Sequence, residues 1–381
     1  MQQSKPQDFK LYRLLALLVS PFLRLIFRFR FRLQRLDGPT LVICNHVTNY
    51  DPLLVAICFR KNHMHFVASE HLFRLGWVSR VIQYITDPIP RRKATSGADT
   101  AMACLRKLRG GRSVCLFAEG ECTWDGVTAP IVPSTGRMAK MSNATLLTCR
   151  LEGAYLTAPR WGKGIRPGKM SFRVVGKYSP DELKKLDGNQ IEALIQKDIH
   201  FDTWESQRQD PVAYRSCQPA ENLQTVLYLC PRCLRNGTMT GKGKILRCQC
   251  GAQWEFTPFG NFVPAEPFEN IAQWDAWQSR ELAAQKDVVL RDQNVTVFRI
   301  EADHKQTPVE TGELVLEKGL LRCGKLSWEL TKIDDLALVL SRNLLMSVGS
   351  DYYQLKAPKG SSLRKYRTVW ENARATTNCE V

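Results

Sequence analysis

The stretch that most constrains the fold of this chain is residues 41–52, LVICNHVTNYDP. Four apolar residues predict a short buried strand, and Asp51 and Pro52 predict an N-cap and the first position of a helix. His46 and Asp51 then share one tight strand-to-helix turn. A histidine that a carboxylate orients is a common way to prepare a general base near neutral pH. The alternative is that Asp51 only caps the helix and His46 is only a loop residue.

A second strand followed by a turn is predicted at residues 113–120. Residues 113–117, SVCLF, have the composition of a buried strand, and Ala118-Glu119-Gly120 follows them directly. In open α/β sheets, functional sites gather beyond the carboxyl ends of the strands. The two turns therefore predict one site at one edge of a sheet.

The segments around these two turns alternate between strand and helix patterns. Further strands are predicted at residues 63–68, 144–149 and 169–176, and helices at 74–84, 96–109 and 136–141. Strands separated by helices are typical of an α/β sandwich with a largely parallel sheet. The fold class expected for this part of the chain is therefore α/β, with a sheet flanked by helices.

Taken together, five segments of this region resemble the glycerolipid acyltransferase family, the 1-acylglycerol-3-phosphate acyltransferases. These segments are Asn45-His46 with Asp51, residues 87–93 (DPIPRRK), residues 117–120 (FAEG), residues 133–137 (PSTGR) and residues 147–153 (LTCRLEG). The resemblance covers roughly residues 38–175, and its strength lies in the order and spacing of all the segments. It implies an acyltransferase-type α/β fold.

The resemblance also implies roles for individual residues. His46 is the general base, Asp51 orients it, and Glu119 positions the glycerol portion of the acceptor or supports the turn. The implied substrate-binding residues are Asn45, Arg91, Arg92, Lys93, Gly120 and Arg137. Arginine suits phosphate geometry, although a solvated surface loop is the alternative for the basic residues. No serine or cysteine nucleophile belongs to the motif, so direct attack without an acyl-enzyme is expected.

The chain departs from the family pattern immediately after Gly120. The family continues with one further residue, an arginine and a hydroxyl residue, whereas this chain has Glu121-Cys122-Thr123. Cys122 therefore occupies the arginine position, and a thiol cannot replace a phosphate ligand. Ala118 is a milder change from proline. Either another basic residue compensates (Arg137, Lys140 or Arg150), or the acceptor is not a phosphate monoester.

The N-terminal residues predict attachment to a membrane surface. The chain has a formal net charge of +17, which favours an anionic partner. Within residues 10–27 the longest run without charge is ten residues, Leu14 to Leu23, and a bilayer requires about 20. Basic flanks and a break at Pro21 fit an interfacial, monotopic anchor that binds anionic lipid, whereas the alternative is a core helix. The expected location is the cytoplasmic face of the cytoplasmic membrane, and the scattered cysteines fit a reducing compartment.

Residues 27–32, FRFRFR, alternate strictly between phenylalanine and arginine. This period of two predicts a strand with one apolar and one cationic face. Asp37-Gly38-Pro39 predicts a turn, so the strand is expected to form a hairpin with residues 41–44. Its arginines would then lie near the site turn, where they contact phosphate or simply form a solvated face.

Two cysteine pairs predict a zinc ribbon. Cys230 and Cys233 are followed, after fourteen residues, by Cys248 and Cys250, and a basic hairpin lies between the pairs. Four cysteines at this spacing predict a tetrahedral, structural Zn²⁺ site. Four unrelated buried cysteines and a redox-active Cys-x-x-Cys pair are the alternatives.

The C-terminal part of the chain predicts a β-rich domain. Strand patterns recur from residue 288 to residue 355, and a helix is expected over residues 363–370. A run of strands closed by one helix resembles a small pleckstrin-homology-like β-barrel. The domain organisation expected is an anchor and first strand over 1–36, an acyltransferase domain over 37–210, a zinc ribbon over 211–262 and the β-rich domain over 263–381.

Three hypotheses for function compete. The leading one is a peripheral membrane acyltransferase that esterifies a lysophospholipid, 1-acylglycerol-3-phosphate or a related molecule, from acyl-CoA or acyl-carrier protein. Nucleic acid is not a partner under this hypothesis. The second is a zinc-ribbon nucleic-acid-binding protein, which leaves His46, Asp51 and Glu119 unexplained. The third is a non-catalytic membrane-associated scaffold on the same fold, for which Cys122 is the best argument.

Overall fold

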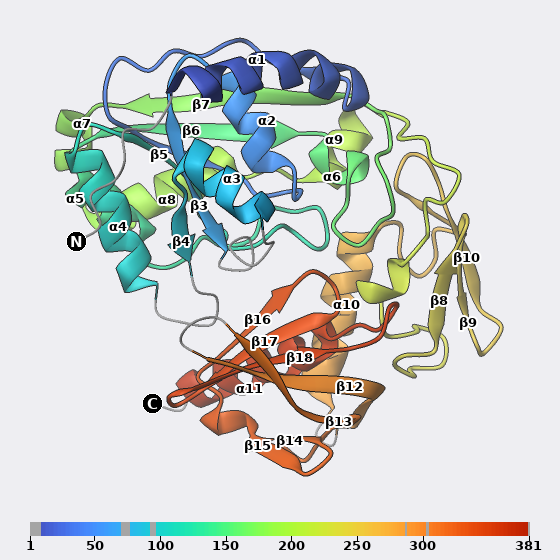
Figure 1. Ribbon diagram of the computed structural model, residues 1–381. Helices are drawn as coiled ribbons and strands as arrows, with labels where there is room; N and C mark the ends of the chain where they lie inside the picture. The colour runs from blue at the N-terminus through green and yellow to red at the C-terminus, as the bar shows by residue number, and fades with distance from the viewer. Residues whose placement is uncertain (1–8, 70–76, 92–96, 286–287, 302–304, 380–381) are drawn as a thin grey trace. The chain divides into compact units, whose positions relative to one another are not determined.

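The computed structural model describes residues 9–69, 77–91, 97–285, 288–301 and 305–379, which form two compact units (Figure 1). The first unit comprises the described residues up to Ser216 except residues 161–163. The second takes those three residues and the chain from Cys217 onward. The division into four domains stays a prediction.

The first unit is an α/β sandwich around a seven-stranded sheet of order β1-β7-β6-β2-β5-β3-β4. Its strands are β1 (Phe29–Arg30), β2 (Thr40–Cys44), β3 (Met64–Ser69), β4 (Ile89–Arg91), β5 (Ser113–Phe117), β6 (Thr145–Glu152) and β7 (Met170–Tyr178). The pairs from β6 to β4 are parallel, while β7 runs antiparallel to β6. The largely parallel α/β sheet predicted from the sequence is therefore confirmed.

Helices cover both faces of this sheet. They are α1 (Phe9–Ile26), α2 (Asp51–Cys58), α3 (Trp77–Thr86), α4 (Ala98–Arg109), α5 (Thr135–Ser142), α6 (Ala154–Thr157), α7 (Pro180–Lys184), α8 (Gly188–Ile199) and α9 (Thr203–Gln209). Leu41 and Ile43 of β2 pack into one apolar core with residues of α4, α5 and α8. Helix α1 contacts both α2 and α3, and these three helices lie on the other side of the sheet (Figure 1).

The hairpin predicted for residues 27–44 is wrong. β1 contains only Phe29 and Arg30, and it pairs in parallel with Met170 and Ser171 of β7. β2 is flanked by β5 on one side and β6 on the other, so it has no free edge for a hairpin partner. The alternation of residues 27–32 therefore adds an edge strand that β7 and β6 separate from β2.

Two predicted helix boundaries also differ from the structure. Pro21 lies inside α1 and does not break it. Because Pro21 is on the solvent side of the helix, water can satisfy the carbonyl that loses its hydrogen bond. At the start of α2, Tyr50 is the N-cap and Asp51 is the first helical residue. Asp51 therefore does not cap the helix but directs its carboxylate back to the turn.

The second unit contains two sheets. The first sheet comprises β8 (Met239–Lys242), β9 (Ile245–Cys248), β10 (Gln253–Phe256) and β11 (Phe262–Val263), and α10 (Ile271–Ala284) follows it. Trp274 and Gln278 of α10 bond to the backbone of residues 226–229, just before Cys230. The predicted basic hairpin is β8 and β9, which are antiparallel.

The C-terminal sheet is antiparallel, with the order β15-β14-β13-β12-β18-β17-β16. Its strands are β12 (Leu290–Ile300), β13 (Gln306–Glu317), β14 (Leu320–Cys323), β15 (Leu326–Glu329), β16 (Asp335–Val339), β17 (Asn343–Val348) and β18 (Asp351–Lys356). The terminal helix α11 (Arg364–Cys379) buries Tyr366 and Trp370. The β-rich C-terminal region is confirmed, and its likeness to a pleckstrin-homology domain stays a prediction.

Candidate active site

The site is built where β2 and β5 end beside each other in the sheet. Cys44, the last residue of β2, is in register with Phe117, the last residue of β5. His46 and Glu119 each follow two residues later, and the backbone N–H of His46 donates to Glu119 Oε1 at 2.6 Å. The sequence-predicted proximity of the two turns is therefore present in the structure.

Asp51 is fully buried and organises the whole turn. Its Oδ2 accepts the N–H groups of Val47 at 2.6 Å and Thr48 at 2.9 Å, and it lies 2.9 Å from His46 Nδ1. Its Oδ1 accepts the hydroxyl of Thr48 at 2.7 Å. Because the carboxylate can only accept from Nδ1–H, this pair leaves Nε2 of the neutral imidazole able to take a proton. His46 and Asp51 thus have the geometry of an oriented general base.

The imidazole of His46 is held between an aromatic ring and a sulfur atom. It stacks on Phe117 with ring centroids 4.5 Å apart, and Cys122 Sγ lies 3.5 Å from both ring nitrogens. Burial lowers the pKa of His46, but the sulfur of Cys122 and the bond to Asp51 outweigh it and raise this pKa to about 10. The side chain is 18% exposed, so the ring remains open to a substrate.

Glu119 connects three segments of the site. Its Oε1 binds His46 N–H, and its Oε2 accepts the N–H of Ala129 at 2.7 Å. Burial raises the pKa of Glu119 to about 7, although the two N–H bonds act in the opposite direction. These contacts match the turn-supporting role suggested by the sequence.

Gly120 and Arg91 lie next to each other, although 29 positions separate them in the chain. Gly120 has φ +79°, and a Cβ built on it would lie 3.6 Å from Arg91 Nη2. The left-handed backbone suits glycine. The predicted phosphate ligand Arg91 therefore reaches the Glu119-Gly120 turn. Arg92 and Lys93, predicted beside it, lie outside the described residues.

Asn45 and Arg137 are the remaining residues that the resemblance implies to bind the substrate. Asn45 is buried, its Nδ2 donates to Leu151 O at 3.0 Å, and its Oδ1 accepts Leu151 N–H at 2.7 Å. Its contacts tie β2 to β6 and give no support to a substrate-binding role. Arg137 is exposed on α5, where its backbone packs against Gly188. Neither residue joins the cluster around His46.

The loop that carries Cys122 is held by Arg160, which sequence reasoning missed. Arg160 Nη1 donates to Glu121 Oε2 at 3.0 Å and to Cys122 O at 2.7 Å, and the guanidinium lies 3.7 Å from the centre of the Trp124 ring. Of the three residues expected to compensate for the missing arginine, Lys140 and Arg150 bond to Leu186 O and Asp198 O. No sequence motif marks Arg160, because its partners lie 38 and 39 positions earlier.

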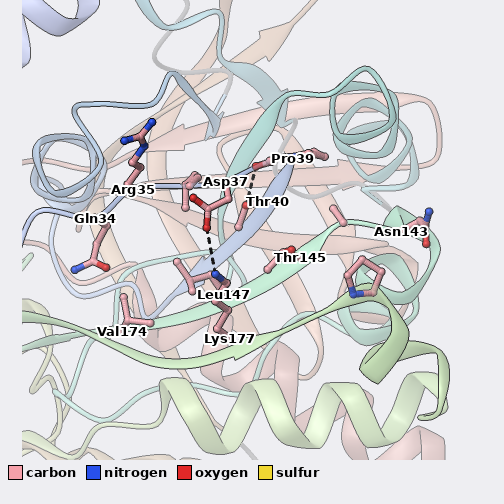
Figure 2. Close-up of a pocket in the computed structure, with 14 residues that line it drawn as sticks. Gln34, Arg35, Asp37, Pro39, Thr40, Asn143, Thr145, Leu147, Val174 and Lys177 are labelled. Atoms are coloured by element: carbon pink, nitrogen blue, oxygen red, sulfur yellow. Dashed lines mark hydrogen bonds and ion pairs between the residues drawn. The ribbon is translucent and has the colours of Figure 1, made fainter.

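A cavity of about 350 Å³ lies at the opposite end of the strands, where β2 and β6 begin (Figure 2). Thr40 and Thr145, the first residues of β2 and β6, line it, and Asp37 and Lys177 face each other across 3.6 Å at its wall. His46 follows the other end of β2. This cavity is therefore separate from the candidate active site.

The four predicted metal ligands form a cluster in the second unit. The sulfur atoms of Cys230, Cys233, Cys248 and Cys250 all lie within 4.8 Å of one another. The separations between Cys230 and Cys250 and between Cys233 and Cys248 are 3.8 and 3.7 Å. A tetrahedron with Zn–S bonds of about 2.3 Å has edges of about 3.8 Å, so the donor set fits a tetrahedral metal.

Comparison with known proteins identifies the segment that contains the first site. Residues 26–152 match the Acyltransferase family model. The chain is also similar to a crystal structure of the 1-acyl-sn-glycerophosphate (LPA) acyltransferase PlsC from Thermotoga maritima, with 16% identity and a TM-score of 0.39 over 50% of this chain and 78% of that chain. Residues 26–152 therefore resemble the acyltransferase family, and they contain His46, Asp51 and Glu119.

Proposed function

We propose that this protein transfers a fatty acyl group from a thioester donor to the hydroxyl group of a lysophospholipid. The donor is acyl-CoA or acyl-carrier protein, and the acceptor is 1-acylglycerol-3-phosphate or a related lyso-lipid. The observation that carries the proposal is the 2.9 Å pair of His46 and Asp51 at the end of β2, within the segment that matches the acyltransferase family.

Each group of the site has a role in this reaction. Asp51 holds Nδ1 of His46, so the ring in its deprotonated form takes the proton of the acceptor hydroxyl group at Nε2. Glu119 holds the backbone of His46 in place. Arg91, beside Gly120, binds the acceptor phosphate, because a guanidinium matches phosphate geometry with two parallel hydrogen bonds.

Helix α1 supports a location at a membrane surface. Leu14, Leu17, Leu18, Phe22 and Leu25 are each more than half exposed, and they form one stripe opposite the buried Tyr12, Ala16 and Leu23. Arg13, Arg24 and Arg28 are exposed near it. An apolar stripe flanked by arginines is complementary to an anionic lipid surface, and we place the protein at the cytoplasmic face of the cytoplasmic membrane.

Among the described residues, no helix has the length and apolar character needed to cross a membrane.

The cysteine cluster would hold Zn²⁺ through Cys230, Cys233, Cys248 and Cys250. Four thiolates close all positions of a tetrahedral ion, so the metal supplies structural stability and no catalysis. The cluster then fixes the β8–β9 hairpin. Exposed basic residues in and just before this hairpin give the second candidate function, nucleic-acid binding, its best support: Arg232, Arg235, Lys242, Lys244 and Arg247.

The test of the proposed function is an acyl-transfer assay on the purified chain in anionic vesicles. Labelled palmitoyl-CoA is offered with a panel of lyso-lipids, both with and without a phosphate group. The expected result is turnover on a phosphate-bearing acceptor, and the loss of that turnover in His46→Ala. His200→Ala, an exposed histidine at the end of α8, is the matched control.

Other outcomes of this assay would point elsewhere. Turnover only on phosphate-free acceptors would move the specificity away from lysophosphatidate. Absence of turnover with every acceptor and with both donor classes would contradict the proposal. Binding of single-stranded or duplex nucleic acid that weakens steeply with salt would then favour the second candidate.

A further inference from the structure

The turn that carries the first two cysteines of the metal cluster exposes a leucine between two arginines. Residues 230–235 have the sequence CPRCLR, and Leu234 is 54% exposed. Arg232 and Arg235 are exposed on either side of it. Metal binding requires only Cys230 and Cys233 of this turn, and the proposed acyl transfer involves none of its residues. The exposed leucine and its arginines therefore have no role in either function.

The backbone of this turn holds Leu234 in an unfavourable conformation. Leu234 N–H donates to Cys230 O at 2.9 Å, and Cys230 N–H donates to Arg235 O at 3.2 Å. These bonds close the turn with Leu234 at φ +56°, in the left-handed region that favours glycine. Among the described non-glycine residues with positive φ, only Leu234 and Leu340 are apolar. Because such strain is concentrated where residues bind a partner, the exposed leucine indicates an apolar contact outside the chain.

The sequence on both sides of Leu234 is basic. Residues 222–254 contain no aspartate or glutamate, and their five basic residues are all exposed: Arg232, Arg235, Lys242, Lys244 and Arg247. Glu221, just before this stretch, accepts the N–H of Gly243 in the turn between β8 and β9, at the end of the hairpin away from the cysteines. The charged residues nearest to Leu234 in the chain are therefore all positive.

We propose that residues 231–235 are a second lipid-binding surface, which docks on an anionic membrane. Leu234 inserts at the boundary between headgroups and acyl chains, and Arg232 and Arg235 contact lipid phosphates. This surface belongs to the second unit and is distinct from the apolar stripe of α1. Its binding to lipid does not depend on the proposed acyl transfer.

A lipid surface fits the composition of this turn better than a nucleic acid does. An apolar side chain flanked by arginines is complementary to the membrane interface, since long basic side chains keep their charge at the level of the headgroups. Each arginine near an anionic surface strengthens binding about fivefold. Proteins that bind single-stranded nucleic acid stack its bases on aromatic side chains, and residues 230–235 include no aromatic residue.

The cysteine cluster gives this surface a rigid base. The sulfur atoms of Cys230 and Cys233 lie within 4.8 Å of those of Cys248 and Cys250, and Arg235 donates a hydrogen bond to the sulfur of Cys233. A turn held in this way loses little conformational entropy when Leu234 binds. Because α1 and the turn belong to one chain, attachment of either raises the local concentration of the other at a lipid surface.

The experiment measures the binding of the zinc-loaded, full-length protein to vesicles by sedimentation. One set of vesicles is phosphatidylcholine alone, and the other is phosphatidylcholine mixed with phosphatidylglycerol. Leu234→Gly and Leu234→Asn should each weaken binding to the anionic vesicles about tenfold, because a buried leucine side chain contributes about this much. Arg232→Gln should weaken it about fivefold and should not affect binding to the neutral vesicles.

Two further measurements separate a lost contact from a damaged fold. The Tm of Leu234→Gly should not fall, because relief of the left-handed strain offsets the freedom that glycine adds to the unfolded chain. Leu340→Gly is the matched control, since Leu340 is also exposed, with φ +59°, in the turn between β16 and β17, and it should leave vesicle binding unchanged. In the native protein, anionic vesicles should slow hydrogen exchange of a peptide that spans residues 231–237.

Three outcomes would overturn the inference. They are unchanged vesicle binding in Leu234→Gly, an equal loss of binding in Leu340→Gly, and binding of single-stranded DNA or acyl-carrier protein, in place of vesicles, that Arg232→Gln and Leu234→Gly both weaken. Phe22→Ser, in the exposed stripe of α1, reports the contribution of that helix separately. No acyl donor is present, so failure of the proposed acyl transfer would leave these results unchanged.

Discussion

The two units of this protein place cysteine in opposite surroundings. In the first unit, Cys122 is a single sulfur beside the imidazole of His46, and Asn49 and Arg160 contribute its other polar contacts. In the second unit, four sulfur atoms face one another within 4.8 Å across hairpin turns. A thiol beside an imidazole has a neighbour that exchanges protons, whereas four thiolates around one metal ion form a closed structural site.

This comparison shows that neighbours, and not residue type, decide what a cysteine can do. The sulfur of Cys122 lies 3.5 Å from both nitrogens of the His46 imidazole, a ring that can donate or accept a proton. The cluster cysteines have other cysteines as their nearest partners, so their sulfur atoms are suited to bind one metal ion together.

The largest effect is expected from removing a ligand of the cysteine cluster. Cys248→Ser should abolish zinc binding and destabilise the second unit, because structural zinc contributes about 10–16 kcal/mol of apparent binding free energy. Elemental analysis and thermal unfolding measure both effects. Cys217→Ser, exposed and outside the cluster, should retain the metal. Full zinc content in Cys248→Ser would show that Cys248 is not a zinc ligand and would contradict the structural role of the cluster.

The second effect concerns the carboxylate beneath His46. Asp51→Asn should lower the free energy of unfolding by about 3–5 kcal/mol, because breaking a buried charge pair leaves its partners unsatisfied. It should also remove acyl transfer, since Nδ1 of His46 loses its acceptor. Chemical denaturation and the transfer assay measure the two consequences. The exposed Asp181→Asn is the control, and near-native activity in Asp51→Asn would contradict the assigned geometry.

The third effect tests whether the first unit recognises phosphate. Arg91→Ala should weaken binding of a phosphate-bearing acceptor about 10–100-fold, because a hydrogen bond to a charged group contributes about 1.5–3 kcal/mol. The KM for a phosphate-free lyso-lipid should change much less. Arg106→Ala, an exposed arginine on α4, is the matched control. Equal losses with both acceptors would argue against phosphate binding by Arg91.

The fourth effect is a pH dependence of stability. The pKa of His46 is raised from 6.5 to about 10, so its stabilising contribution is fully present below pH 6.5 and is lost as the pH rises through about 10. The groups that face His46 are Asp51, Cys122 and the Glu119 carboxylate at its backbone N–H. The difference in Tm between the native protein and His46→Gln should shrink steadily from pH 6.5 to pH 10.

The same series in Cys122→Ala provides the check on the cause. Without the sulfur, the pKa of His46 should lie closer to its ordinary value, so the decline should begin at lower pH. NMR titration of the His46 ring in both proteins measures the shift directly. An unchanged titration in Cys122→Ala would show that Cys122 does not set the charge of His46.

Much of the architecture could be predicted from local patterns. The strand at residues 113–117 matches β5 residue for residue, and the four cysteines were correctly grouped. Short apolar runs and ligand spacing are properties of the sequence itself, so they can be recognised without knowledge of the fold. The hairpin of residues 27–44 failed because a period of two identifies a strand but not its partner.

The amino-acid sequence by itself determined the alternation of strands and helices, the His46–Asp51 turn and the cysteine cluster, because each depends on residues close together in the chain. Tertiary structure alone decided that Asn45 ties β2 to β6, that Arg91 meets Gly120, and that Arg160 and His46 hold Cys122 between them. These contacts join residues 29 to 106 positions apart, and only the packing of the sheet brings such distant side chains within bonding distance.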